Sequence, residues 1–186
     1  MKKTFIAIII GMALCVSFLP AQDGANRLGA ILNNFSPRAH FTTGAILQAD
    51  LDLIVRAAVR TGSAGNRQPW FFTVVQDLSL AQKIVSQSVE GNIIIVISTE
   101  GTTSREIIDC ALAAQTIYLA AQALGYGSQM YLAPIERLNN ELKGDLGLPA
   151  NRNAVLAVRI GRVAAGIDAV SGASPRRDAS EMVTYR

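Results

Sequence analysis

Apolar residues recur at helical spacing in two stretches of the chain. Between Asp50 and Arg60 they fall three and four residues apart, with acidic residues early and arginines late, as a helix dipole favours. A longer stretch starts at Thr103 and Glu106, which have capping-box spacing, and runs through Ala-, Leu- and Ile-rich sequence to Gly125, a residue typical beyond a helix end. We predict an amphipathic helix in the first stretch and a long buried helix in the second.

Strand-like segments alternate with these helices. The run from Ile93 to Ile97 is continuously apolar, as expected for a strand covered on both faces, so we place it at the centre of a sheet. Enrichment in aromatic and β-branched residues and the flanking turn residues define the others. The further predicted elements are strands over 70–75, 128–131 and 154–160 and shorter helices over 26–34, 78–87 and 134–143. A loop is expected over 37–48, and little periodicity remains after Gly161.

The composition indicates one globular domain. Half of the 186 residues are hydrophobic and 17% are charged, which excludes a disordered or fibrous chain. His40 is the only histidine, so the chain does not supply a multi-histidine metal site or an ordinary Ser/His or Cys/His pair, and we expect His40 in a loop. Cys110 lies in Ala-rich helical sequence and is expected to be a small buried apolar residue and not a redox nucleophile.

The N-terminus is typical of a secretory signal peptide. Lys2 and Lys3 precede an apolar run of roughly 15 residues, and Ala21 offers a cleavage position. The run is shorter than the ~20 residues that a membrane-spanning helix needs. We therefore expect a signal peptide over 1–21 and a folded domain over 22–186.

Removal of that segment changes the location and charge expected for the protein. The mature chain would be exported, periplasmic or extracellular, with no stable membrane span. An uncleaved anchor and acylation at Cys15 are the alternatives. The net charge of +3 falls by two when Lys2 and Lys3 leave, so electrostatics gives no case for nucleic acid as a partner.

A polar loop joins the first helix to the strand that begins at Trp70. Residues 63–70 read Ser-Ala-Gly-Asn-Arg-Gln-Pro-Trp. The Asn66 amide supplies both a donor and an acceptor, which suits the alternating C=O and N–H groups of a pyrimidine-like ring, and the small residues let backbone approach a ligand closely. By chemistry alone, a plain turn with Asn66 in a left-handed conformation explains the sequence equally well.

Three motifs together resemble the FMN-dependent nitroreductase family. The first is this loop with its flanking helix and the strand Phe-Phe-Thr-Val-Val. The second is Asp-Cys-Ala-Leu-Ala-Ala-Gln at 109–115, continued to a glycine-marked helix end, and the third is Arg-Arg-Asp-Ala-Ser-Glu-Met-Val at 176–183. The resemblance implies an α+β nitroreductase-like fold, with a central, mostly antiparallel sheet flanked by helices and a long buried central helix.

The resemblance also implies which residues bind FMN. Ser36 and Arg38 match the family's basic-x-Ser-x-basic signature, in which Asn34 replaces the first basic residue. The replacement implies either weaker FMN binding or a substitute contact from Arg27 or another residue. Leu132 and Ala133 match the place where backbone N–H groups face flavin N5. The implied cofactor-binding residues are Ser36, Arg38, Asn66, Gln68, Leu132, Ala133, Arg176 and Arg177.

The arginines in this set would stabilise negative charge on FMN. Reduction places negative charge on the N1/C2 edge of the flavin, which Arg38 would stabilise. Arg176 and Arg177 would hold the phosphate dianion with forked donors. A solvated basic tail is the alternative for these last two residues.

The activity implied is two-electron transfer through flavin N5 to a nitroaromatic, a quinone or a similar small acceptor, with NAD(P)H as a possible donor and with no catalytic side chain or metal. Family members usually bind FMN at a homodimer interface, which would also cover the apolar surface of the long helix. The main alternative is an exported flavin-binding protein of the same fold without NAD(P)H-dependent turnover, since ordinary NAD(P)H is not supplied outside the cytoplasm. A hydroxyl-rich loop at 98–104 is a competing phosphate site, but Thr103 already serves as a helix cap.

Overall fold

The sheet at the centre of the molecule is antiparallel. The computed structural model describes residues 28–34, 37, 40–166 and 177–186, so the predicted signal peptide lies outside the described residues. Its strands are β1 Phe41–Thr42, β2 Phe71–Val75, β3 Ile93–Thr99, β4 Gly127–Tyr131 and β5 Asn153–Val163. The order is β1-β5-β3-β2, β4 also pairs with β5, and each pairing among the described strands is antiparallel.

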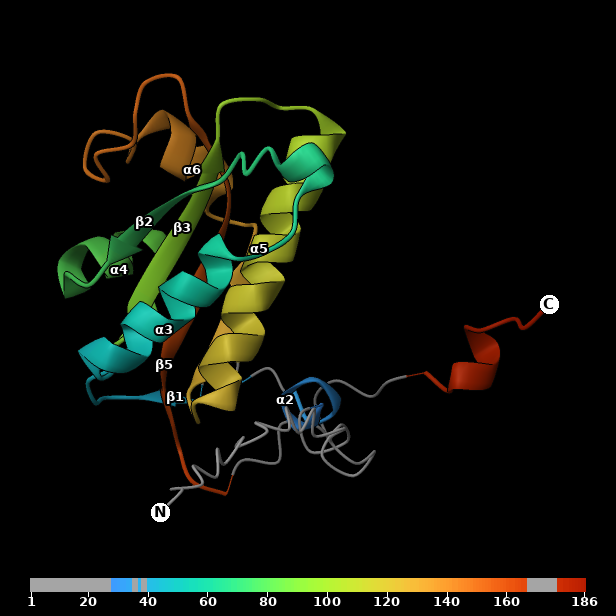
Figure 1. Ribbon diagram of the computed structural model, residues 1–186. Coiled ribbons are helices and arrows are strands. Elements are labelled where there is room, and N and C mark those ends of the chain that lie inside the picture. The colour runs from blue at the N-terminus through green and yellow to red at the C-terminus, as the bar shows by residue number, and fades with distance from the viewer. Residues whose placement is uncertain (1–27, 35–36, 38–39, 167–176) are drawn as a thin grey trace, which may run out of the picture.

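Helices cover both faces of this sheet. They are α2 Gly29–Leu32, α3 Gln48–Val59, α4 Leu78–Ile84, α5 Ser104–Ala123 and α6 Ile135–Asn140, with short 3-10 turns η1 Ala64–Asn66 and η2 Ala179–Glu181. Figure 1 shows α3 and α5 side by side along one face. On the other face, Ala81 and Ile84 of α4 and Leu138 of α6 pack into a separate core.

β3 is an interior strand, as its apolar run predicts. It lies between β2 and β5, and each of its residues is buried. Ile93, Ile95 and Ile97 join the core formed with α3 and α5, whereas Ile94 and Val96 join the core formed with α4 and α6. Because side chains alternate between the two faces of a strand, burial of both faces leaves no position for a polar residue in this run.

The long helix begins and ends where its sequence signals lie. The Thr103 hydroxyl accepts the N–H of Glu106, and the Glu106 carboxylate accepts the N–H of Thr103, which completes the predicted capping box. Gly125, after the helix, has a φ of 83°. Thr103 therefore acts as a cap, and the capping interpretation of the 98–104 loop is confirmed.

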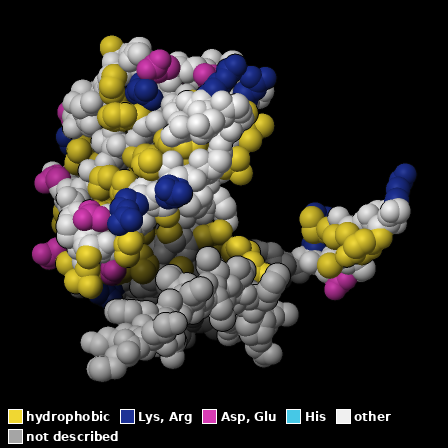
Figure 2. Space-filling view, viewed as in Figure 1, with side chains coloured by type: hydrophobic (Ala, Val, Ile, Leu, Met, Phe, Trp, Pro, Cys, Tyr) yellow, Lys and Arg dark blue, Asp and Glu magenta, His cyan; other side chains and the backbone are white. Residues whose placement is uncertain are grey.

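The burial predicted for α5 holds for only one of its faces. Its sheet-facing residues, among them Ala113, are buried. Ile107, Ile108 and Leu112 are 42%, 58% and 49% exposed. The sheet covers one side of the helix, and these residues lie on the other side. Figure 2, which views this side of the molecule, shows hydrophobic side chains spread over it.

Several elements differ in extent from the sequence predictions. α4 ends at Ile84, before the predicted end at residue 87, and β5 continues to Val163, beyond the predicted end at residue 160. The predicted loop over 37–48 contains β1, because Phe41 is buried against Arg159 and pairs with Val163. A strand of two residues is too short to show a period in sequence. The helix predicted over 134–143 is shorter, with Pro134 as its N-cap and Asn140 as its last residue. The apolar residues that follow still reach the second core from turns, and these are Leu142, Leu146 and Leu148.

The C-terminal segment 177–186 lies apart from the body of the domain and all of its residues are exposed (Figure 1). His40 is exposed and lies outside the helices and strands, as predicted. Within the described ranges, no helix has both the length and the hydropathy needed to cross a membrane.

Candidate functional site

The loop between α3 and β2 has an unusual backbone. Gly65, Asn66 and Gln68 have φ values of 63°, 53° and 49°. A left-handed conformation is uncommon for residues other than glycine and costs on the order of 1 kcal/mol or more for each. The plain-turn interpretation is correct for the backbone of Asn66, but it does not account for the second left-handed residue. Both amide side chains are exposed, so the strain presents two hydrogen-bonding groups to solvent.

Hydrogen bonds within the loop maintain this shape. The Ser63 hydroxyl accepts the N–H of Gln68 at 2.9 Å, and the Ser63 carbonyl accepts the N–H of Asn66 at 3.0 Å. The Gln68 amide donates to the Asn66 side-chain oxygen at 3.1 Å. This hydrogen bond fixes the two amides relative to each other. It uses the oxygen of the Asn66 side chain and not its NH₂ group.

The end of the loop is fixed to the sheet by Arg152, just before β5. Its guanidinium donates to the Pro69 carbonyl at 3.2 Å, pairs with Glu100 at 3.0 Å and lies 5.2 Å from the centroid of the Phe71 ring. Trp70, which lies between Pro69 and Phe71 in the sequence, is buried and stacks on Phe72. The loop therefore has a rigid exit into β2.

The start of the loop is fixed to α5 by Asp109. This residue is 3% exposed, and its Oδ1 accepts the N–H of Ala64 at 3.1 Å. A second link joins Thr61 and Thr116 through their hydroxyls at 2.9 Å. A cavity of about 630 Å³ lies between these loop residues and α5, and another of about 590 Å³ lies on the Arg67 side of Asp109.

Cys110, beside Asp109, is an inert thiol. It is fully buried, and burial together with the neighbouring Asp109 carboxylate raises the pKa of the thiol to about 11. A thiol must ionise to act as a nucleophile. The prediction that Cys110 is a small buried residue is confirmed.

The second part of the candidate site follows β4. Leu132 is 72% exposed, and Ala133 is also exposed. Among the described backbone hydrogen bonds outside helices and strands, none is donated by Leu132 or Ala133. These two N–H groups thus have no described backbone acceptor, and their role toward a ligand stays a prediction.

In a single chain, these two parts of the candidate site lie at opposite edges of the sheet. The loop containing Asn66 leads into β2, whereas Leu132 follows β4, and β3 and β5 lie between those strands. Neighbouring strands are ~4.8 Å apart, so the two parts are separated by roughly 14 Å along the sheet. Of the other predicted residues, Ser36, Arg38 and Arg176 lie outside the described residues, and Arg177 is exposed in the C-terminal segment.

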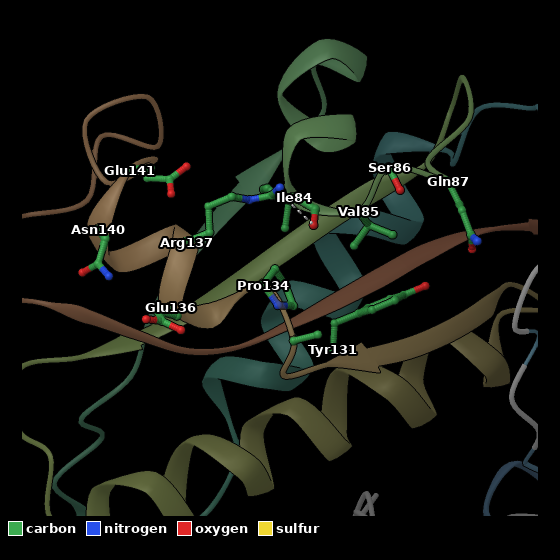
Figure 3. Close-up of a pocket in the computed structure, with 11 residues that line it drawn as sticks. Ile84, Val85, Ser86, Gln87, Tyr131, Pro134, Glu136, Arg137, Asn140 and Glu141 are labelled. Carbon is green, nitrogen blue, oxygen red and sulfur yellow. Dashed lines mark hydrogen bonds between the residues drawn. The ribbon is translucent and has the colours of Figure 1, made fainter.

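Ala133 also borders a cavity on the face of the sheet that α4 and α6 cover, and this cavity does not suit an anionic cofactor. It has a volume of about 630 Å³ and lies between the end of α4 and α6 (Figure 3). Arg137 donates there to the carbonyl oxygens of Lys83 and Ile84, so it caps the C-terminal end of α4. The carboxylates of Glu136 and Glu141 also border this cavity and would repel a phosphate.

Sequence reasoning overlooked Asp109 and Arg152. Asp109 occupies a position four residues before Ala113 and eight before Ile117, in the stripe that α5 buries against the sheet. A carboxylate within an apolar stripe is a signal that could have identified it. Arg152 gave no comparable signal, because its contacts with Pro69 and Glu100 join segments far apart in the sequence. No group of three or more potential metal ligands occurs in the described part of the chain.

Comparison with known proteins identifies the fold and the family. The model of the nitroreductase family matches residues 89–162. Crystal structures of a nitroreductase with bound FMN from Desulfitobacterium hafniense and another from Bacteroides fragilis are 23% and 20% identical, with a TM-score of 0.71 each, and both matches cover 86% of this chain and 97% of the other. A relative from Archaeoglobus fulgidus named as an NADH dehydrogenase/NAD(P)H nitroreductase is 32% identical over 128 residues, which are 62% of this chain and 74% of the relative. The predicted fold is thus confirmed, and the chain belongs to the nitroreductase family.

Proposed function

We propose that this chain is an FMN-dependent oxidoreductase that passes two electrons to a small acceptor, such as a nitroaromatic or a quinone. The observation that carries the proposal is the strained loop of a nitroreductase-family chain, which presents the exposed amides of Asn66 and Gln68. FMN, when bound, supplies the two-electron chemistry. The protein contributes binding, orientation and electrostatics.

The donor groups of the chain fit FMN. The Asn66 amide has both a donor and an acceptor for the polar edge of the ring, and Gln68 holds its oxygen at 3.1 Å. The N–H groups of Leu132 and Ala133, which have no acceptor among the described backbone groups, suit acceptor atoms such as N5. Arg38, Arg176 and Arg177 would supply positive charge for the N1/C2 edge and the phosphate. Ser36 would add a hydroxyl near the phosphate or ribityl chain.

We further propose that two copies of the chain form the complete site. The parts that contain Asn66 and Leu132 lie at opposite edges of the sheet in one chain, and α5 has an uncovered apolar face with Ile107, Ile108 and Leu112. A homodimer through this face would bury these side chains. It would also bring the sheet edge with Asn66 of one copy near the sheet edge with Leu132 of the other. NAD(P)H remains the proposed donor, following the name of the Archaeoglobus fulgidus relative.

We also propose that residues 1–21 direct export and are then removed. The support is the sequence pattern of Lys2, Lys3, an apolar run and Ala21. N-terminal sequencing of the protein recovered from the cell exterior or periplasm tests this. A protein that remains in the cytoplasm with an intact Met1 would contradict it.

The test of the proposed cofactor is an absorbance and fluorescence titration of the purified mature protein with FMN, followed by anaerobic addition of NADH or NADPH. We expect saturable FMN binding and bleaching of the bound flavin, and reoxidation on addition of a quinone or nitroaromatic. No FMN binding would overturn the proposal. Binding without reduction by either nucleotide would instead support the flavin-binding alternative without NAD(P)H turnover.

The role of Asn66 is tested with a glycine replacement. Asn66→Gly removes the amide but keeps a residue that adopts a φ of 53° without strain. We expect the Kd for FMN to rise about tenfold, as for the loss of one or two hydrogen bonds. Asn140→Gly, at the end of α6, is the matched control and should leave the Kd unchanged. Equal Kd values for the wild type and Asn66→Gly would exclude a flavin contact by this amide.

A further inference from the structure

We propose that Asp109 is a positioning residue, which sets the conformation of the 63–68 loop from beneath and thereby the orientation of the Asn66 amide toward FMN. The second part of this proposal, the orientation of Asn66 toward FMN, rests on the proposed function. The loop conformation is strained at Asn66 and Gln68, so something must hold it. The hydrogen bonds inside the loop fix its own shape, whereas Asp109 joins the start of the loop to α5.

Asp109 is suited to this role by its place on α5. It lies on the buried face of a helix of 20 residues, directly before Cys110, which is fully buried. The backbone of a long, capped helix moves little, so its side chains are a firm reference for a loop. A carboxylate also accepts a more stable hydrogen bond from a backbone N–H than a neutral oxygen does. The N–H of Ala64 is thus held one residue before the first left-handed residue, Gly65.

The second oxygen of Asp109 indicates a functional site. Within the described residues, Oδ2 is buried and has no hydrogen-bond partner. A buried carboxylate oxygen without a partner is costly, and a fold that served only stability would not favour it. Asp109 borders both cavities that flank the loop, so its charge lies where the loop meets open space. An apolar residue at this position would pack in the α5 stripe without that cost.

Three other sites were less informative. The cavity between α4 and α6 is bordered by Arg137, whose guanidinium already caps α4. The buried Arg159 has an unpaired nitrogen, but Asn92, Gln87 and the Phe41 ring surround it and no described cavity reaches it. The uncovered face of α5 belongs to the dimer already proposed. Asp109 joins a buried oxygen without a described partner directly to the 63–68 loop.

The first experiment tests the anchor without any flavin. Hydrogen–deuterium exchange is measured at the backbone amides of 63–68 in the apo protein, for the wild type, Asp109→Ala, Asp109→Asn and Cys110→Ala. We expect the Ala64 amide to exchange at least about tenfold faster in Asp109→Ala, since it loses a hydrogen bond to a charged acceptor. Asp109→Asn keeps an oxygen at the same place and should restore most of the protection. Cys110→Ala, on the same buried face, should leave the loop unchanged.

The second experiment tests the link to the flavin by a double-mutant cycle. Asp109→Ala should weaken FMN binding about tenfold, and Asn66→Gly should do the same. If Asp109 acts through Asn66, the double variant should bind FMN no more weakly than Asn66→Gly alone, and Asp109→Asn should bind nearly as well as the wild type. A merely structural role predicts additive losses and a shift that Asp109→Asn does not rescue.

The outcomes separate this proposal from the proposed function. Unchanged exchange at the Ala64 amide in Asp109→Ala overturns the anchor, whatever the flavin titration gives. Faster exchange with unchanged FMN affinity, or additive losses in the cycle, overturns the link to Asn66. A wild-type protein that binds no FMN overturns the proposed function and the second part of this proposal, while the exchange result still decides the anchor.

Discussion

At the scale of single residues, close backbone approaches make some glycines essential and leave others replaceable. Gly91, just before β3, has a φ of 83°, and a Cβ added there would collide with the backbone carbonyl of Gly44. Gly125, just after α5, has the same φ of 83°, but no atom lies within 4 Å of its added Cβ. The pair therefore separates the effect of a clash from that of backbone strain.

We expect Gly91→Ala to lower the free energy of unfolding by about 3 kcal/mol and Gly125→Ala by about 1 kcal/mol. Both variants acquire the strain of a left-handed alanine, but only the first must also move backbone at Gly44. Urea unfolding followed by circular dichroism measures the two differences. Equal losses would mean that the approach of Gly91 to Gly44 is not as close in solution.

The residues that support the loop show why sequence reasoning located the loop but not its supports. Asn66 and Gln68 belong to a contiguous motif, so the sequence alone identified them as candidates. Asp109 and Arg152 contact the loop from positions roughly 45 and 83 residues away along the chain. Pairing over such distances is set by the packed fold, and the local residue pattern does not contain it.

At the scale of elements, the capping box gives the start of α5 a dependence on pH. Hydrogen bonds from the Thr103 side chain and backbone hold the pKa of Glu106 below its ordinary value of 4.5. A carboxylate whose pKa is lowered on folding stabilises the protein above its ordinary pKa, and this contribution disappears as the pH falls through the folded-state pKa. The effect is therefore present at neutral pH and lost in acid.

Glu106→Gln keeps the shape of the capping box but removes the charge. We expect its melting temperature to be below that of the wild type at pH 7 and the gap to close as the pH is lowered below about 4.5. Thermal melts between pH 7 and pH 3 give the comparison. Glu141→Gln, at the end of α6, serves as the control. A gap that persists unchanged at pH 3 would contradict a stabilising charge at Glu106.

Most elements were predictable because each carries a local signal. The run over 93–97, the capping residues of α5 and the periodicity of α3 each indicate an element by themselves. β1 carries none, because it consists of two residues and exists only through pairing with β5. The end of α6 at Asn140 was missed because the apolar pattern continues beyond it, although the residues there reach the core from turns.

At the scale of the whole molecule, one side of α5 exposes apolar side chains that the described part of a single chain does not cover. Leu112 is 49% exposed and Ile108 is 58% exposed, on the same side of the helix. Ile107, on the same helix, is 42% exposed. An apolar surface of this kind on a small domain favours association.

We expect Leu112→Glu to convert a dimer into a monomer, since burying a carboxylate in an apolar interface costs several kcal/mol. Multi-angle light scattering after size-exclusion chromatography measures the mass. Ser86→Glu, which adds the same charge beyond α4 on the other face of the sheet, should leave the dimer intact. A wild type that elutes as a monomer, or a Leu112→Glu variant that stays dimeric, would contradict the proposed interface.

The burial of Cys110 makes its thiol a probe for detachment of α5 from the sheet. With a pKa of about 11, roughly one thiol in a thousand is ionised at pH 8, and none is reachable while α5 lies on the sheet. A thiol reagent can therefore modify Cys110 only in molecules whose long helix has detached. The labelling rate under native conditions then counts such openings directly, and its change on adding FMN or on dilution would show whether cofactor or partner keeps the helix in place.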